Sequence, residues 1–180
     1  RQWSRGLGDV YKRQVYEGGY RVPAIVWMPG SVPKTTTNVL ASALDLFPTM
    51  VSLAGGQYDQ KSIDGFDLTK TFFENVPIRS DIHYYRQDTL IAIRHNEWKM
   101  YIKDPNPWDD GPTQNEMPLL YNVEHDPSEK YDIRKENETI IKEIQNLYED
   151  HLQSVFKAPS QYDTIIPSYQ PAFDDNNKKN

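Results

Sequence analysis

The chain has 180 residues, a length that suits one ordinary domain or a small domain with part of another. Hydrophobic residues make up 37% of it, the net charge is -6, and no apolar stretch is long enough to span a bilayer, so we expect a soluble protein without a membrane span. Lysine and arginine alternate with acidic residues and form no basic patch, which argues against nucleic acid as a partner. Without cysteine, neither a disulfide nor a thiolate nucleophile is available.

The first predicted element is a strand within "RVPAIVWMPG", residues 21–30. A short apolar run lies there between Pro23 and the turn pair Pro29-Gly30. Continuous apolar character over so few residues is typical of a strand buried on both faces of a parallel sheet. The sequence therefore predicts a sheet strand around residues 24–27.

A helix is predicted from Asp45 to the pair Gly55-Gly56. Asp45 is a suitable N-cap, and Pro48 falls in the first turn, where its missing N–H costs nothing. The apolar residues expected on one face, which we expect to cover the preceding strand, are Leu46, Met50, Leu53 and Ala54. A strand followed by a covering helix is the end of an α/β unit.

The pattern changes after residue 73. Three aromatic and β-branched runs, 80–86, 89–103 and 118–126, predict an antiparallel meander with a tight hairpin at Asn96. A loop rich in Pro, Asp and Gly is expected over 104–118. Apolar residues at helical spacing predict an amphipathic helix from Asn137 to about Phe156 that lies across the sheet.

Five segments carry a family resemblance: "YEGGYRVPAIVWMPG", "ALDLFPTMVSLAGG", "IDGFDL", "IAIRHNEWKMY" and "LLYNVEHDPSEKYDI". In their order and approximate spacing they resemble the C-terminal part of formylglycine-dependent sulfatases, in particular the arylsulfatase A-like branch of the alkaline-phosphatase superfamily. The resemblance implies an α/β fragment plus an α+β unit. Residues 15–73 are expected to end the sulfatase α/β catalytic domain, residues 74–158 to form a small antiparallel sheet packed on a long C-terminal helix, and residues 159–180 to be an extended or frayed tail.

The resemblance also implies a reaction, which is hydrolysis of the sulfate esters of a glycan or an aryl compound. In the family the nucleophile is a formylglycine made in a Cys/Ser-x-Pro-x-Arg motif, and it lies beside a calcium ion held by oxygen ligands. This chain has neither that motif nor the family's metal-binding Asp and Asn residues. We therefore expect no catalytic or metal-binding residue in this chain, an inactive fragment, and the catalytic machinery upstream.

Residues 1–14 differ in character from the rest of the chain. The segment "WSRGLGDVYKRQ" resembles translated library-adapter sequence found at the ends of unrelated proteins from metagenome assemblies. We expect a non-native tail there and take Val15 as the first native residue. Lys12 stands four residues before Tyr16, where the family usually has a sulfate-binding lysine, but it belongs to this tail and receives no catalytic role.

Several residues are candidates for contact with a substrate. His83, Tyr85 and Arg86 follow the expected domain boundary, where the family's small domain faces the substrate cleft; packing between strands is the alternative for His83 and Arg86. Glu17 and Arg21 flank the Gly18-Gly19 turn, and we expect them at the active-site rim, more as a structural pair than as oxyanion ligands. The 4 histidines have no partner at a metal-ligand spacing, so no zinc site is predicted.

Two other functions stay open on the sequence. One is a different alkaline-phosphatase superfamily enzyme, a phosphoesterase or phosphotransferase with an unmodified Ser or Thr nucleophile and two zinc ions. The other is a non-catalytic C-terminal module. By analogy with the family, a periplasmic or secreted bacterial protein is expected, although no signal peptide is present in this sequence.

Overall fold

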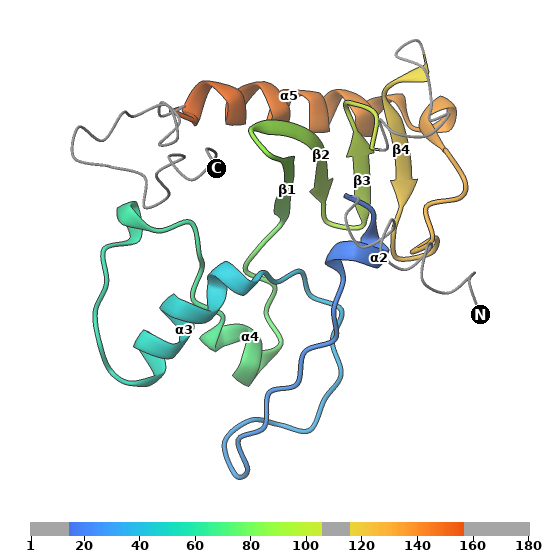
Figure 1. Cartoon of the computed structure of the whole chain (residues 1–180). Coiled ribbons are helices and arrows are strands. Elements are labelled where there is room, and N and C mark those ends of the chain that lie inside the picture. Colours follow the sequence, from blue (N-terminus) through green and yellow to red (C-terminus); the bar gives the residue numbers. More distant parts are fainter. Residues whose placement is uncertain (1–14, 106–115, 157–180) are drawn as a thin grey trace, which may run out of the picture.

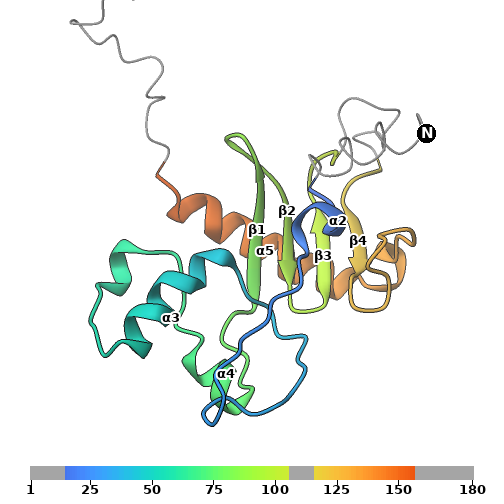
Figure 2. The same ribbon diagram turned by 60° about the horizontal axis from the view of Figure 1, so that its bottom comes forward.

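The computed structural model describes residues 15–105 and 116–156. A four-stranded sheet forms the centre, the long helix α5 (Glu138–Ser154) crosses one of its faces, and the short helix α2 (Glu17–Tyr20) lies on the opposite face (Figures 1 and 2). A second group of helices, α3 and α4, lies beyond the end of the sheet. Residues 1–14, most of the predicted loop 104–118 and the predicted tail from residue 159 are outside the described residues.

The predicted meander is confirmed. The strands are β1 (Asp81–Arg86), β2 (Thr89–His95), β3 (Trp98–Tyr101) and β4 (Leu119–Asn122). They are antiparallel in the order β1-β2-β3-β4, with Ala92 opposite Tyr101 and Met100 opposite Leu120. Asn96 has φ 52° in the β2–β3 turn, the left-handed conformation that asparagine tolerates.

The two faces of the sheet form two separate cores, as alternation along a strand requires. One core faces the Val15–Tyr20 segment and contains Val15, Tyr84, Ile91, Ala92, Tyr101, Leu119, Tyr121 and Val123. The other faces α5 and contains Leu90, Ile93, Met100, Leu120 and Ile144. The sheet is therefore covered on both sides by segments from the two ends of the described chain.

The predicted C-terminal helix is confirmed as α5 (Glu138–Ser154). Ile144 is fully buried against the sheet, and Ile140, Ile141 and Tyr148 pack partly against the same core. A η4 turn, Arg134–Glu136, precedes the helix, and the Ile133 N–H donates to the Leu120 carbonyl to join this connection to β4. The expected apolar face thus packs on the sheet at Ile140, Ile144 and Tyr148, whereas Leu152 near the end of the helix is exposed.

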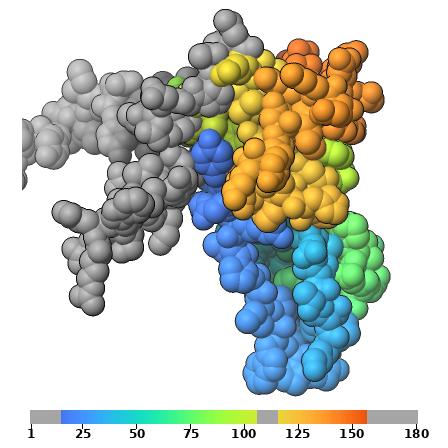
Figure 3. Space-filling view, turned by 90° about the vertical axis from the view of Figure 1, so that its right-hand side faces the viewer, coloured from blue at the N-terminus to red at the C-terminus, as the bar shows by residue number. Residues whose placement is uncertain are grey.

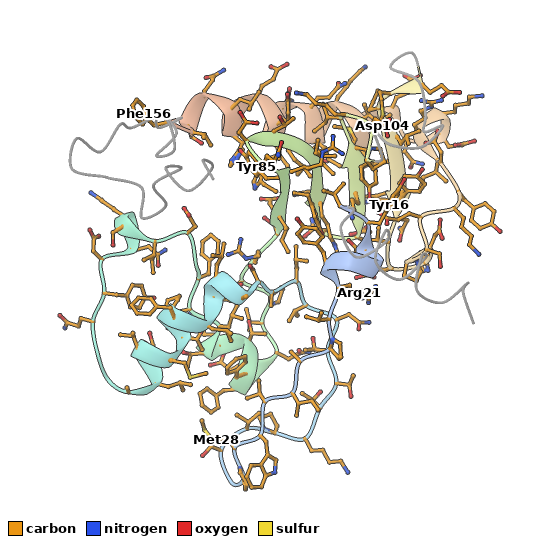
Figure 4. All side chains as sticks on the ribbon, viewed as in Figure 1. Tyr16, Arg21, Met28, Tyr85, Asp104 and Phe156 are labelled. Carbon is orange, nitrogen blue, oxygen red and sulfur yellow. The ribbon has the colours of Figure 1, made fainter. Side chains whose placement is uncertain are left out.

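The strand predicted around residues 24–27 is wrong. Residues 21–28 have no regular secondary structure, and Ile25 and Trp27 are 92% and 84% exposed. Figures 1 and 3 show this stretch in one arm of a long loop that projects from the body formed by the sheet and α5, with Met28 near its tip in Figure 4. A central strand requires hydrogen-bonded neighbours, and the described residues supply none to this segment.

The helix predicted from Asp45 is present as α3 (Leu46–Leu53), preceded by η1 (Ala43–Asp45), and Asp45 is its N-cap residue as predicted. The side chain of Asp45 makes no capping hydrogen bond to α3, and it belongs instead to the capping box of η1, whose N-cap is Ser42. The face expected to cover a strand is exposed at Leu46 and Met50. Without the strand, this face has no covering partner among the described residues.

Asp45 instead joins three segments. Its buried carboxylate accepts hydrogen bonds from the Ser42 N–H at 2.7 Å and the Phe66 N–H at 2.9 Å. It also forms an ion pair with Arg79, whose Nε lies 3.0 Å from Oδ2. Since Arg79 also donates to the Asp64 carbonyl, this node connects the start of α3, the loop before α4 (Thr69–Glu74) and the chain entering β1.

Gly65 lies in the loop that Asp45 and Arg79 attach to the start of α3. A substitution at Gly65 tests how closely this loop packs. A Cβ atom built at Gly65 would collide with the Leu44 carbonyl oxygen, whereas one built at Gly18 would meet nothing within 4 Å. We predict that Gly65→Ala lowers the free energy of unfolding by about 2 kcal/mol or more and that Gly18→Ala has a smaller effect. Urea denaturation of both variants checks this, and equal stabilities would contradict it.

Candidate functional site

The Gly18-Gly19 turn forms the short helix α2 (Glu17–Tyr20), which begins at Glu17 and has Arg21 as its C-cap. It is closed by hydrogen bonds from the Gly19 N–H to the Tyr16 carbonyl at 2.9 Å and from the Arg21 N–H to the Glu17 carbonyl at 2.7 Å. The chain becomes extended at Arg21 and leaves the sheet. Figure 4 shows Tyr16 and Arg21 near the two ends of this turn, which lies against the sheet.

Glu17 is the centre of a buried charged cluster on this face of the sheet. Its side chain is 2% exposed and accepts hydrogen bonds from Tyr84 Oη at 3.1 Å, Arg94 Nη1 at 3.2 Å and Lys99 Nζ at 3.1 Å. The pair with Arg21 that the sequence suggested is therefore wrong. Three groups on three neighbouring strands hold the Glu17 carboxylate instead.

Glu129 completes the cluster from the connection between β4 and α5. Its Oε2 accepts from the Glu17 N–H at 2.8 Å, and its Oε1 accepts from Tyr101 Oη at 2.6 Å. Lys99 Nζ lies 3.0 Å from the same Oε1. The resulting buried ionic cluster, Glu17, Glu129, Arg94 and Lys99, combines two carboxylates with two cations and is neutral as a whole.

The tyrosines around the buried ionic cluster stay protonated. Burial raises the pKa of Tyr84, and the charge of Glu17 raises it further. Burial likewise raises the pKa of Tyr101, reinforced by the charge of Glu129 and the hydrogen bond to it. Both phenols therefore act as hydrogen-bond donors to carboxylates at any ordinary pH.

Arg21 lies at the edge of this arrangement. Its Nη1 donates to the Val123 carbonyl at 3.2 Å, just after β4. Neighbouring Tyr20 packs its ring on Tyr84 with centroids 4.9 Å apart, and its Oη lies 3.4 Å from the Tyr85 carbonyl. Side chains at the end of α2 thus reach towards both edges of the sheet.

Lys99, Arg94 and Glu129 were not identified from the sequence as site residues. One signal was available, because Arg94 and Lys99 occur in a strongly apolar pair of strands at positions that are paired across the hairpin. Charged residues inside a buried strand require partners. Those partners lie far away in the sequence, and only the folded chain brings them together.

His83 and Tyr85 lie together at the edge strand β1, and both contact α5. The rings of His83 and His151 stack with centroids 3.7 Å apart and planes inclined by 17°. The Tyr85 hydroxyl lies 2.7 Å from His151 Nε2. Burial, reinforced by the neighbouring His151, lowers the pKa of His83 to about 4.

Arg86 is not brought to the same place as His83 and Tyr85. Its Nη1 lies 3.4 Å from the Asp104 carbonyl and 3.3 Å from the Pro105 carbonyl, in the segment after β3. The pairing of β1 with β2 is irregular between Tyr84 and Tyr85. The three predicted substrate contacts are therefore not all in one place. His83 and Tyr85 of β1 contact α5, whereas Arg86 is bound to backbone carbonyls after β3.

A shallow hollow of about 300 Å³ lies between the 37–40 segment and the β2–β3 turn. Its polar lining comes from Thr37, Asn38, Arg79, Arg94, Asn96, Glu97 and Glu124. None of the five predicted site residues lines it, and both arginines already have carboxylate partners.

Within the described ranges, no three His, Asp or Glu side chains form a group able to hold a metal ion. None of the helices described is long and apolar enough to cross a membrane.

Comparison with known proteins identifies the family. A model of the C-terminal region of aryl-sulfatase matches residues 77–178, and a sulfatase model matches residues 5–56. The chain therefore belongs to the sulfatase family and contains its C-terminal region. The second match begins before Val15, in residues whose structure is not described, so the boundary of the predicted tail stays a prediction.

Individual relatives agree with the family models. N-acetylgalactosamine-6-sulfatase of Rattus norvegicus is 30% identical over 89% of this chain and 33% of its own length. Human arylsulfatase A is 33% identical over 71% of this chain and 29% of its own length. A Bacteroides thetaiotaomicron structure described under the metabolism of multiple glycosaminoglycans superposes with a TM-score of 0.62 and 27% identity, over 77% of this chain and 30% of that one. The chain thus spans about a third of the length of these relatives.

The stacked histidines make a prediction about pH. Because the pKa of His83 is about 4 in the folded chain against its usual 6.5, the unfolded state binds more protons between these values, and stability falls as the pH falls from 6.5 to 4. The pKa of His151 is also lowered, so His151 acts on stability in the same direction. At His83, the charge of Arg79 contributes to the lowering of the pKa, whereas the charge of Asp81 raises it.

We predict that His83→Phe, which keeps a ring on His151, reduces the loss of stability between pH 6.5 and pH 4. Urea denaturation across this pH range measures the effect, with His125→Phe at an exposed position as the matched control. An unchanged pH dependence in His83→Phe would show that His83 does not titrate in this way.

Proposed function

We propose that this chain is part of a sulfuric ester hydrolase that cleaves sulfate esters through a formylglycine nucleophile and calcium. The observation that carries the proposal is the order of the two family matches, sulfatase at residues 5–56 and aryl-sulfatase C-terminal region at residues 77–178. The motifs in the sequence support the same assignment. They favour a sulfatase over a two-zinc phosphoesterase or phosphotransferase of the same superfamily.

The described residues do not supply the chemistry of that reaction. They contain no group of metal ligands, and the whole sequence contains no Cys and no Ser-x-Pro-x-Arg motif. In our proposal the nucleophile and the calcium ligands belong to a preceding part of a longer protein, and the 180-residue chain alone is inactive. The chain contributes the last part of the catalytic domain, residues 15–73, and the small C-terminal subdomain, residues 74–158.

The proposed substrate is a sulfated glycan or an aryl sulfate. Two relatives support the glycan: one is named for N-acetylgalactosamine-6-sulfate ester cleavage, and the other is described under glycosaminoglycan metabolism. Arylsulfatase A supports the aryl sulfate. We also propose a periplasmic or secreted location in a bacterium, by analogy with the family.

His83, Tyr85 and Arg86 are proposed to contact the part of the substrate away from the sulfate. The edge position of β1 supports this, because an edge strand borders the space next to the sheet. Glu17 and Arg21 are proposed to lie at the active-site rim. Both side chains attach the turn to the sheet, which supports a role in shaping the rim. Glu17 itself is buried and therefore inaccessible to a ligand.

The first test is an activity assay. We predict that the purified chain does not hydrolyse a chromogenic aryl sulfate, with or without added calcium. The coding sequence is then extended upstream from the codon for Val15, and the completed protein is predicted to contain a Cys/Ser-x-Pro-x-Arg motif and to cleave the ester. A two-zinc site upstream, or a completed protein without sulfatase activity, would contradict the proposed function.

A second prediction concerns Arg86 in the completed enzyme. If its guanidinium contacts the substrate, Arg86→Gln raises KM about tenfold and leaves kcat nearly unchanged, because an interaction of equal strength in the ground and transition states is lost. Lys142→Gln, at an exposed position on α5, is the control. Steady-state kinetics with a sulfated disaccharide measure both constants, and an unchanged KM would remove Arg86 from the substrate site.

A further inference from the structure

Lys99 is an unusual residue for the middle of a sheet. It lies in β3, its side chain is 0% exposed, and its neighbours along the strand are the buried Met100 and the half-buried Trp98. A buried ammonium group is costly unless it is paired and hydrogen-bonded. An apolar residue of similar length would avoid the cost of burying the ammonium group, but on its own it would leave the buried Glu17 and Glu129 carboxylates short of a cation.

All three hydrogens of the Lys99 ammonium group have acceptors within reach. Its Nζ lies 2.7 Å from the Val15 carbonyl, 3.1 Å from Glu17 Oε1 and 3.0 Å from Glu129 Oε1. The Tyr84 ring supplies a further contact, with its centroid 4.2 Å from Nζ. The group is therefore saturated, and two of its three acceptors belong to the segment just before and within α2.

The contacts bind backbone as well as side chains. Lys99 holds the Val15 carbonyl, Glu129 holds the Glu17 N–H, and Tyr101 Oη lies 3.3 Å from the Val15 carbonyl. A carbonyl and an N–H bound on either side of Tyr16 determine the direction of the chain there as well as its proximity to the sheet. Bonds of this kind determine orientation, which hydrophobic packing does not.

The residues that hold the segment come from distant parts of the chain. Lys99 is separated from Val15 by 84 positions, and Glu129 is separated from Glu17 by 112. Both belong to the C-terminal subdomain, whereas the held segment belongs to the preceding domain. The place of the Glu17–Tyr20 turn therefore depends on the C-terminal sheet.

We propose that Lys99, together with Glu129, is a positioning residue that sets the place and direction of the Val15–Arg21 segment. The proposed function places this turn at the active-site rim. Any effect of Lys99 on catalysis therefore rests on that function, whereas its effect on the position of the segment does not. The C-terminal subdomain then orients part of the catalytic domain through a buried ammonium group. Stability alone does not require the buried ionic cluster, since a whole buried ion pair is often replaceable by apolar residues without loss.

The test compares hydrogen exchange in the full chain and its variants. In Lys99→Met, the exchange rates of the Glu17, Gly19 and Arg21 amides are expected to rise about tenfold, the effect of losing one buried hydrogen bond on local opening. Exchange in β2 and β3 away from residue 99 reports global opening, and it is expected to rise only by the loss of overall stability, less than at these three amides. Lys103→Met, at an exposed position just after β3, is the matched control and should change neither region.

A double variant separates positioning from stability. Lys99→Met with Glu17→Gln removes one cation and one carboxylate, so the buried ionic cluster is neutral again with Arg94 and Glu129. We expect this double variant to recover most of the stability lost in Lys99→Met. The segment should still exchange fast, because the Val15 carbonyl has lost its closest donor.

Three outcomes would overturn the proposal. Unchanged exchange at residues 17–21 in a folded Lys99→Met chain would show that packing alone holds the segment. Recovery of slow exchange in the double variant would show a role in charge balance only. A rise of exchange in the sheet of both variants as large as the rise at residues 17–21 would show a general structural role. None of these depends on sulfatase activity, so failure of the proposed function would be visible separately in the assay of the completed protein.

Discussion

The buried pairing of Lys99 with Glu17 and Glu129 is the interaction on which the arrangement of the two parts of this chain depends. Lys99 comes from the middle of the sheet, Glu17 from the turn before it and Glu129 from the connection after it. One ammonium group thus joins segments from both ends of the described chain. With Arg94 the cluster is neutral, which makes its burial tolerable.

A second buried ion pair, between Asp45 and Arg79, joins segments in the same way among the helices that precede the sheet. Asp45, fully buried, receives two backbone N–H groups and the guanidinium of Arg79, which lies over the Phe66 ring at 4.6 Å. The first node attaches the α2 turn to the sheet, and the second attaches the α3 and α4 helices to the start of β1. Between the two nodes, the segment around Ile25 and Trp27 is held by neither and lies exposed.

The contact between Glu17 and Lys99 joins the two regions of the chain that match the sulfatase family models. The sulfatase match and the aryl-sulfatase C-terminal match meet in space at the α2 face of the sheet, and Glu17 and Lys99 lie one in each. In our proposal, the C-terminal sheet influences the active site of the longer protein by determining where the Glu17–Tyr20 turn lies. That is the role we propose for the small sheet.

The sequence by itself determined the elements whose patterns are local: the four strands, the Asn96 turn and α5 were all predicted correctly, because alternation, turn chemistry and helical spacing are properties of neighbouring residues. It also indicated the family through the order of its motifs. Only the tertiary structure decided the rest. The predicted strand near Ile25 is wrong because a strand requires partners, and the Glu17–Arg21 pair is wrong because Lys99 and Arg94, about 80 positions away, reach the carboxylate instead. Which charges meet inside a protein is decided by long-range packing, and no local pattern encodes it.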